Sequence, residues 1–337
     1  MTSILFRCDA TADIGFGHLS RCIALAEALR LSGATCSFAG QYDDAAADQV
    51  RAAGFACESL PSPVNSLGAA KELAGLPKTG AIVLDSYRAD ESYIAGLGSS
   101  GARVIVIDDF RALPAYPCDV VLNFTQEAPS LSYPDGPTLL LGPHFLPARR
   151  RLVEQRARSI ERDRTGAVGN VLIAVGGSDP KGLTARLLRC LKGQADGITV
   201  RAIAQSTAEL EPLLSGFSAD SAILPRQKDL SDQLLWADAA ITGGGLIKYE
   251  SAYMAVPVAA IAQNEGQDGE TQVFAKAGLV FDLGLADTVE DAQLAQALGT
   301  FLSDASLRTT MAERMRDAFI ADPSAHAAHA ILEAVSR

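Results

Sequence analysis

The sequence has little positive charge, few aromatic residues and no long apolar run. Of its 337 residues, 29 are Lys or Arg and 40 are Asp or Glu, so the formal net charge is −11. An acidic chain lacks the broad cationic surface that drives non-specific nucleic-acid binding, so we expect no nucleic-acid partner. No apolar stretch approaches the roughly 20 residues that a spanning helix needs, so we also expect no membrane insertion.

Paired cysteines and a signal segment are also missing. The six cysteines are scattered and form no C-x-x-C pair. We therefore expect reduced thiols rather than a disulfide framework or a zinc site. The expected cofactor and metal content is none. Residues 1–7 run directly into a strand-like segment, without the basic stretch and apolar core of a signal peptide. The expected location is the cytoplasm.

Short β-branched runs alternate with segments of helical period along the chain, a pattern typical of parallel sheets covered by helices. The first half has expected strands at 3–8, 35–39, 81–84, 104–107 and 120–123. The second half has a similar series at 170–175, 200–204, 222–224, 239–242, 258–261 and 279–282. At this length, the two series predict an α/β protein with two Rossmann-like domains.

A Pro- and Ser-rich segment, 129–147, followed by a basic helical stretch, 149–164, is the expected connection between the domains. We place the domains at residues 1–146 and 147–323. A last helix, within 324–337, could cross back over the first domain.

The first candidate site is Ile14-Gly15-Phe16-Gly17-His18, which precedes a helix. Ligands of open α/β sheets bind beyond the carboxyl ends of the strands, and a glycine turn there presents N–H groups at a helix N-terminus. His18 would stand in the first helical turn, and a histidine can act as a general acid or base near neutral pH. The alternative is a glycine turn in which the histidine caps the helix.

Two glycine turns follow strands of the second half. Gly176-Gly177-Ser178 either cradles a diphosphate or is a tight turn. Gly243-Gly244-Gly245 is costly in chain entropy, which favours a close approach by a ligand, most simply a phosphate at the next helix N-terminus. Glu250, further into that helix, could accept hydrogen bonds from ribose hydroxyls, or it is a solvated carboxylate.

Polar side chains mark two further strand ends. The loop 263–267 carries amides that suit hydroxyl or acetamido groups, although a polar loop without a role is the alternative. Asp108 and Asp109 are either a pair at the ligand site or a solvated turn.

Taken in order, these motifs resemble the UDP-sugar hydrolases of pseudaminic acid biosynthesis, the PseG/SpsG group, which is related to the MurG glycosyltransferases. The resemblance covers roughly residues 5–285. It is carried by Arg7-Cys8-Asp9-Ala10, Ile14-Gly15-Phe16-Gly17-His18 with Arg21-Cys22, Leu84-Asp85-Ser86-Tyr87, Val106-Ile107-Asp108-Asp109, Leu141-Gly142-Pro143-His144-Phe145, Gly176-Gly177-Ser178-Asp179-Pro180, Thr242-Gly243-Gly244-Gly245 with Tyr249-Glu250, and Val256-Pro257. It implies a GT-B fold that binds the substrate between its domains. The implied reaction is the metal-free, inverting hydrolysis of UDP-2,4-diacetamido-2,4,6-trideoxy-β-L-altropyranose to UDP and the free sugar.

The resemblance also implies residue roles. His18 is the expected catalytic acid or base, and Tyr87 and Asn264 help to bind the sugar or place the water. The turn 243–245 is expected to hold the UDP phosphates and Glu250 the ribose. Further substrate contacts are expected from Arg7, Asp9, Gly15, Gly17, Gly176, Gly177, Ser178, Leu246 and Gln267.

The chain departs from the family pattern at two places. Leu246-Ile247 follow the glycines, where the family usually has a hydroxyl residue. The usual Asn-Gln pair appears as Asn264-Glu265-Gly266-Gln267, so either amide is a candidate for the equivalent position.

Two other functions stay open on the sequence. One is a GT-B glycosyltransferase with a UDP-sugar donor, for which the basic stretch 149–164 could serve a membrane-bound acceptor. The other is a UDP-sugar-binding protein without catalysis. In each case the expected partner is a UDP-sugar, and a monomer is the expected state.

Overall fold

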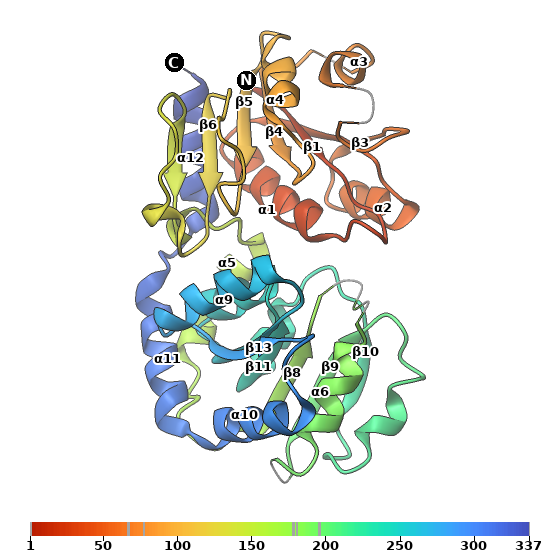
Figure 1. The fold of residues 1–337 in the computed structure, drawn as a ribbon, viewed down its shortest axis with the longest axis vertical. Coiled ribbons are helices and arrows are strands. Elements are labelled where there is room, and N and C mark those ends of the chain that lie inside the picture. The colour runs from red at the N-terminus through yellow and green to blue at the C-terminus, as the bar shows by residue number, and fades with distance from the viewer. Residues whose placement is uncertain are drawn as a thin grey trace. The chain divides into compact units, whose positions relative to one another are not determined.

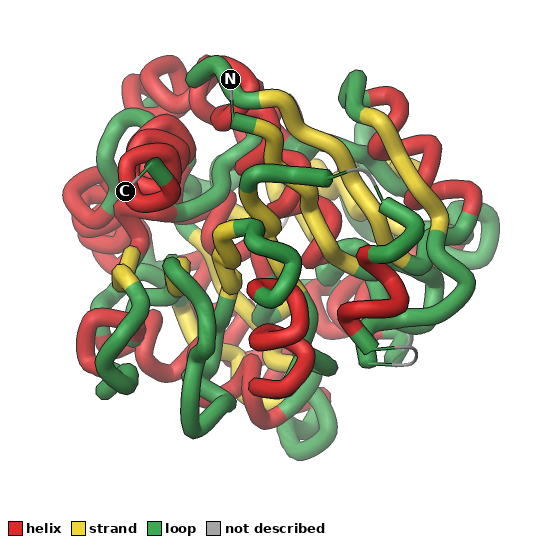
Figure 2. Tube along the Cα trace, turned by 90° about the horizontal axis from the view of Figure 1, so that it is seen from above, coloured by secondary structure: helices red, strands yellow, loops and turns green. Residues whose placement is uncertain are grey.

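The computed structural model describes residues 2–65, 68–76, 78–176, 179, 181–194 and 197–336. The chain divides into two compact units (Figure 1). Unit 1 comprises Met1–Arg150 and Asp322–Arg337, and unit 2 comprises Arg151–Ala321. Each unit contains a parallel sheet with helices packed against it, and Figure 2 distinguishes the strands from the helices in a second view.

Unit 1 is built on a seven-stranded parallel sheet in the order β3-β2-β1-β4-β5-β6-β7. Residues 4–8 of β1 are all buried, as expected for a strand covered on both faces. The strand order reverses between β1 and β4, where Cys8 lies beside Asp85. The strands are β1 Ser3–Cys8, β2 Thr35–Gly40, β3 Ala56–Ser59, β4 Ala81–Asp85, β5 Arg103–Ile107, β6 Val120–Asn123 and β7 Thr138–Leu141.

The C-terminal helix α12 belongs to unit 1 and packs against α1 (Figure 1). Its buried Ser324 accepts a hydrogen bond from the Ala148 backbone N–H and donates one to the Ala148 carbonyl, each at 2.7 Å. This side chain therefore fixes the start of α12 to the segment that follows β7. The α-helices of unit 1 are α1 Gly17–Leu31, α2 Asp44–Ala52, α3 Ala69–Leu73, α4 Glu91–Gly98 and α12 Pro323–Val335.

Unit 2 contains a six-stranded parallel sheet in the order β10-β9-β8-β11-β12-β13, which reverses between β8 and β11. Its strands are β8 Asn170–Ala174, β9 Thr199–Ala204, β10 Ala222–Pro225, β11 Ala239–Gly243, β12 Val258–Ala262 and β13 Phe281–Leu285. Its helices are α5 Arg150–Glu161, α6 Leu183–Leu191, α7 Ser231–Trp236, α8 Leu246–Tyr253, α9 Glu265–Lys276, α10 Asp291–Ser303 and α11 Ala305–Ala318.

The division between the units falls at Arg150 and Arg151, within the basic stretch 149–164, but the Pro-rich segment before it is not wholly a connection. Residues 138–141 form β7, which pairs with β6 at the edge of the unit 1 sheet. The short strand β3 was not predicted either, because its four residues are partly exposed and carry no apolar run. The last strand of unit 2 begins at Phe281 rather than near residue 279, because Leu279 and Val280 belong to the buried turn after α9.

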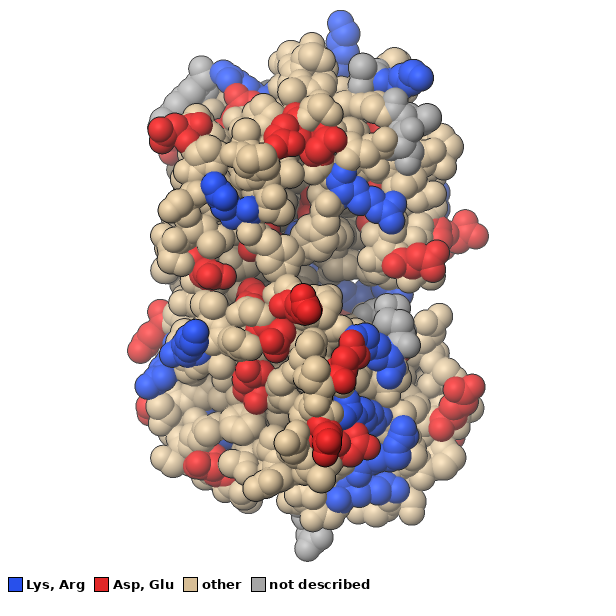
Figure 3. All heavy atoms as spheres, viewed as in Figure 1, with Lys and Arg blue, Asp and Glu red and all other residues tan. Residues whose placement is uncertain are grey.

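Acidic and basic side chains are interspersed on the face of each unit drawn in Figure 3. Within the described part of the chain, no helix combines the length and apolar character required to cross a bilayer.

Candidate active site

His18 lies in the first turn of α1, at the carboxyl edge of the unit 1 sheet. The turn before it relies on Gly15, whose φ of 87° is a conformation that favours glycine. The helix begins after Phe16 without a side-chain cap, and a Cβ added at Gly15 or Gly17 would meet no described atom within 4 Å. The two glycines therefore leave open space beside the first N–H groups of α1.

Asp85 holds the His18 ring from the end of the neighbouring strand β4. The distance between His18 Nδ1 and Asp85 Oδ1 is 2.6 Å. Arg21 donates two hydrogen bonds to the same carboxylate, from Nε to Oδ2 at 2.6 Å and from Nη2 to Oδ1 at 2.7 Å. Burial would raise the pKa of Asp85, but the charge of Arg21 and its contacts with Arg21 and His18 hold it well below its ordinary value. The ionised carboxylate can only accept, and it lies closer to Nδ1 than the other neighbour of this atom, Arg21 Nη2 at 3.2 Å. We therefore assign the ring proton to Nδ1, which leaves Nε2 of a neutral ring as the proton acceptor.

Tyr87 and Asp109 complete the polar cluster around His18. Arg21 Nη1 donates to both oxygens of Asp109 at 2.8 and 2.7 Å, and the Tyr87 hydroxyl donates to Asp109 Oδ2. The Tyr87 ring meets the His18 ring edge-on with 4.5 Å between centroids, while 62% of the residue's surface is exposed. Tyr87 is thus held at its hydroxyl end and presents its ring beside His18.

The two neighbouring aspartates have separate partners. Asp109 belongs to the His18 cluster, whereas Asp108 accepts hydrogen bonds from Tyr116 at 3.0 Å and Tyr133 at 2.5 Å. Neither is the solvated turn that was one of the two alternatives.

Arg7 and Asp9 lie below the surface, with 1% and 3% of their areas exposed. Arg7 pairs with Asp9 at 2.5 Å and with Glu72 at 2.9 Å. Asp9 also accepts hydrogen bonds from the backbone of Gln41 and Val64, each at 2.9 Å. In this structure both residues brace the loops around the strand ends, so we propose a supporting role for them in place of the expected substrate contact.

The glycine loop, residues 243–245, joins β11 to α8 in unit 2. A Cβ at Gly243 would lie 2.4 Å from the Val175 carbonyl oxygen, and a Cβ at Gly244 would lie 3.0 Å from Gln267 Cβ. The close approach expected from three consecutive glycines is therefore made, at least at Gly243 and Gly244, by the protein itself.

Helix α8, which follows this loop, differs from α6 and α9 in that no side chain caps its start. Asp179 accepts hydrogen bonds from the N–H groups of Leu183 and Thr184 at the start of α6. Asn264 caps α9 by accepting from Gln267 N at 3.0 Å. Helix α8 follows Gly245 without a side-chain cap, so its first N–H groups and positive dipole end are the better place for an anion.

The other predicted ligand residues of unit 2 lie around this loop. Gln267 Oε1 accepts from Gln263 N at 3.0 Å, and Leu246 is the first residue of α8. Glu250, one turn later, is 8% exposed. Gly176, with a φ of 132°, follows the end of β8, whereas Gly177 and Ser178 lie outside the described residues.

The sequence reasoning included Arg21 and Asp85 in the shared motifs but assigned no role to either residue. Arg21 lies three residues after His18, which is the spacing of neighbours on one helix face. Asp85 ends a strand that was predicted, and only the strand order shows that this strand lies beside β1. The helical spacing was a usable signal for Arg21, and the strand end was one for Asp85, but the contact of Asp85 with His18 depends on the strand order.

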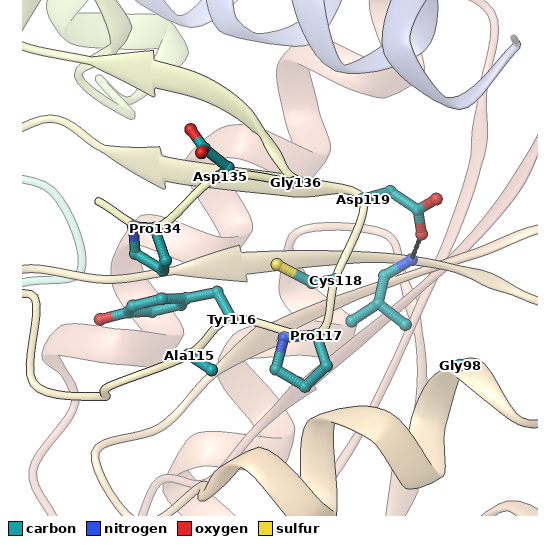
Figure 4. Close-up of a pocket in the computed structure, with 10 residues that line it drawn as sticks. Gly98, Ala115, Tyr116, Pro117, Cys118, Asp119, Pro134, Asp135 and Gly136 are labelled. Atoms are coloured by element: carbon teal, nitrogen blue, oxygen red, sulfur yellow. Dashed lines mark hydrogen bonds between the residues drawn. The ribbon is translucent and has the colours of Figure 1, made fainter.

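A separate pocket of about 560 Å³ lies at the opposite, amino edge of the unit 1 sheet (Figure 4). It is lined by residues near the start of β5 and before β6, including Tyr116, Cys118 and Asp119. The catalytic candidates do not line it. Among the described residues, no group of three or more His, Cys, Asp or Glu side chains is placed to hold a metal ion.

Comparison with solved structures defines the fold class. MurG of Acinetobacter baumannii aligns over 99% of this chain and 100% of its own, with a TM-score of 0.70 and 17% identity. The spinosyn rhamnosyltransferase SpnG, in complex with the spinosyn aglycone, aligns over 100% of both chains, with a TM-score of 0.67 and 16% identity. The chain therefore has the α/β fold of the GT-B glycosyltransferases, and the predicted fold class is confirmed.

Sequence relatives agree with the resemblance carried by the motifs, although no family model matches the chain. An uncharacterized protein of Methanocaldococcus jannaschii is 23% identical over 271 residues, 77% of this chain and 55% of that protein. The spore coat polysaccharide biosynthesis protein SpsG of Bacillus subtilis is 29% identical over 147 residues, 42% of this chain and 43% of its own. The UDP-2,4-diacetamido-2,4,6-trideoxy-β-L-altropyranose hydrolase of Campylobacter jejuni is 27% identical over 137 residues, 39% and 44% of the two chains. The matches span about half the length of these relatives.

Proposed function

We propose that the protein hydrolyses a UDP-activated, N-acetylated deoxy sugar to UDP and the free sugar. Unit 2 holds the diphosphate at the glycine loop and the uncapped start of α8, and unit 1 supplies the base. The observation that carries the proposal is the buried, ionised Asp85, 2.6 Å from Nδ1 of His18, which leaves Nε2 available as a proton acceptor.

In the proposed step, a water molecule attacks the anomeric carbon while its bond to the diphosphate oxygen breaks. His18 Nε2 takes a proton from the water, and UDP departs with the electron pair of the broken bond. Attack opposite the leaving group inverts the anomeric configuration. Backbone N–H groups at the start of α8 stabilise the charge that develops on the diphosphate.

The sugar class is taken from the named Campylobacter relative and from the motifs that this chain shares with that group. Tyr87 presents its exposed ring beside His18, where it can pack against the sugar. Asn264 uses Oδ1 to cap α9, so its amide N–H₂ group is what we propose for the sugar or the water. Gln267 and Leu246 border the diphosphate, and Glu250 is assigned to the ribose.

The test is incubation with UDP-2,4-diacetamido-2,4,6-trideoxy-β-L-altropyranose in the absence of an acceptor, with UDP release and the product anomer followed by NMR. We expect rapid UDP release and an inverted free sugar. Because a general base contributes about 10²–10⁴-fold, His18→Ala should lower kcat by that factor and leave UDP affinity nearly unchanged. His329→Ala, on the exposed face of α12, is the matched control.

The same experiment separates the rival functions. UDP release that requires an added acceptor would favour a glycosyltransferase, which shares the GT-B fold. Tight binding of UDP without turnover of this or related sugars would favour a binding protein. Full activity of His18→Ala would show that the assigned base is wrong.

A further inference from the structure

Lys248 is a buried cation in an unfavourable place. It is the third residue of α8, where the positive end of the helix dipole disfavours a cation, and its exposed fraction is 0%. Lysine is almost never fully buried unless it is paired, and here Nζ forms an ion pair with Glu270 of α9. Buried ion pairs add little net stability compared with apolar packing, so this arrangement calls for another explanation.

The second contact of Lys248 is with the glycine loop. Nζ donates to the Gly244 carbonyl at 2.7 Å and to Thr271 Oγ1 at 3.2 Å. A trans peptide unit points its C=O and the following N–H in opposite directions. With the Gly244 carbonyl turned toward Lys248, the N–H of Gly245, the residue before α8, points away from Lys248.

One face of α9 braces this arrangement. Gln267, Glu270 and Thr271 have the three- and four-residue spacing of helix neighbours. A Cβ on Gly244 would lie 3.0 Å from Gln267 Cβ and 3.2 Å from Thr271 Oγ1, closer than ordinary van der Waals contact. Glu270 also accepts a hydrogen bond from the Tyr249 hydroxyl, so its carboxylate is held from two residues of α8.

We propose that Lys248 is a positioning residue for the diphosphate. It fixes the peptide of the glycine loop so that N–H groups face the anion. Because the loop has this geometry before the ligand binds, binding requires little reorganisation of the backbone. The positive charge, retained behind the loop, also offsets part of the ligand charge. This inference rests on the proposed binding of the diphosphate at residues 243–245.

The test compares UDP with uridine. UDP affinity is measured by calorimetry and uridine binding by saturation-transfer NMR, for the wild type, Lys248→Met, the double variant Lys248→Met/Glu270→Gln and the control Lys276→Met on the exposed side of α9. We expect the two Lys248 variants to bind UDP at least tenfold more weakly, because the Gly244–Gly245 peptide loses the hydrogen bond that fixes its orientation and the loop loses the charge behind it. Uridine binding should be unchanged, and the control should match the wild type for both ligands.

The double variant removes both buried charges, which is a milder change than leaving Glu270 unpaired. If it binds UDP as tightly as the wild type, the loop does not depend on Lys248 and the inference is overturned. Equal losses for UDP and uridine would also overturn it, because they indicate a general structural role. Failure of the wild type to bind UDP would instead refute the proposed function itself.

Discussion

Asp85 contacts Nδ1 of His18, on the side of the ring opposite to the assigned base, Nε2. Asp85→Asn keeps the size of the side chain but removes the charge that holds Nδ1–H of the histidine at 2.6 Å. An amide in this position can equally well donate to Nδ1, which would move the ring proton to Nε2 and remove the proton acceptor. In the Ser-His-Asp triad of proteases this exchange costs about 10⁴-fold in kcat.

For the present site we expect kcat to fall by about 10²–10⁴-fold, which corresponds to about 3–5 kcal/mol of barrier. The affinity for UDP should stay within about twofold of the wild type, because Asp85 lies in unit 1 and the diphosphate is assigned to unit 2. UDP release is the assay for turnover, and calorimetry with UDP is the assay for binding. Thermal unfolding of each variant shows whether the loss of one Arg21 partner has damaged the fold.

A double-mutant cycle with His18→Ala decides whether the carboxylate acts through the histidine. If it does, Asp85→Asn should cost almost nothing once the imidazole is gone, because residues that act as a unit are not additive. If the two losses multiply in the double variant, Asp85 has a separate role, and the assignment of Nε2 as the base loses its support.

Three further outcomes are expected. Tyr87→Phe removes the hydrogen bond to Asp109 but keeps the ring. It should lower kcat/KM by about tenfold without changing UDP affinity, because one hydrogen bond is worth about 0.5–1.5 kcal/mol, or more when one partner is charged. Steady-state kinetics and calorimetry check this. Gly243→Ala should destabilise unit 2 by about 1–3 kcal/mol in denaturant unfolding, because its Cβ would lie 2.4 Å from a carbonyl oxygen; an unchanged midpoint would contradict the packing described here. The pKa of Asp85 in the folded protein lies below its value of about 3.9 in the unfolded chain. The stabilising contribution of the carboxylate is therefore complete above about pH 5 and is lost as the pH falls through the folded pKa. The difference in unfolding free energy between the wild type and Asp85→Asn should shrink below about pH 4.

The strands were predictable where both faces are buried. The runs 3–8 and 120–123 each contain three consecutive apolar residues, Ile4–Phe6 and Val120–Leu122, and the structure reproduces the bounds of both strands. The edge strand β3 was missed because its sequence, Ala-Cys-Glu-Ser, has no apolar run. The edge strand β7 contains the short apolar run Leu139–Leu141, but it was missed because it lies within a Pro-rich segment, between Pro137 and Pro143. Periodicity reports burial, so elements that are half solvated leave only a weak pattern.

The candidate site was predictable as a set of loops but not as a set of contacts. The glycine turns indicated His18 and residues 243–245, because unusual backbone leaves a mark in the sequence. The partners of these residues come from other strands and helices, and their positions depend on strand order. Arg7 and Asp9 show the converse: charged residues in a shared motif can serve the framework as readily as the ligand.

Helix α12 gives unit 1 a discontinuous sequence, since residues 151–321 are placed between its two segments. A chain growing on the ribosome thus completes the whole of unit 2 before the helix that packs on α1 is made. During that interval α1, which carries His18 and Arg21, lacks one of its neighbours. The order of synthesis therefore adds α12 to unit 1 last, and a circular permutant that begins near residue 322 would place this helix first.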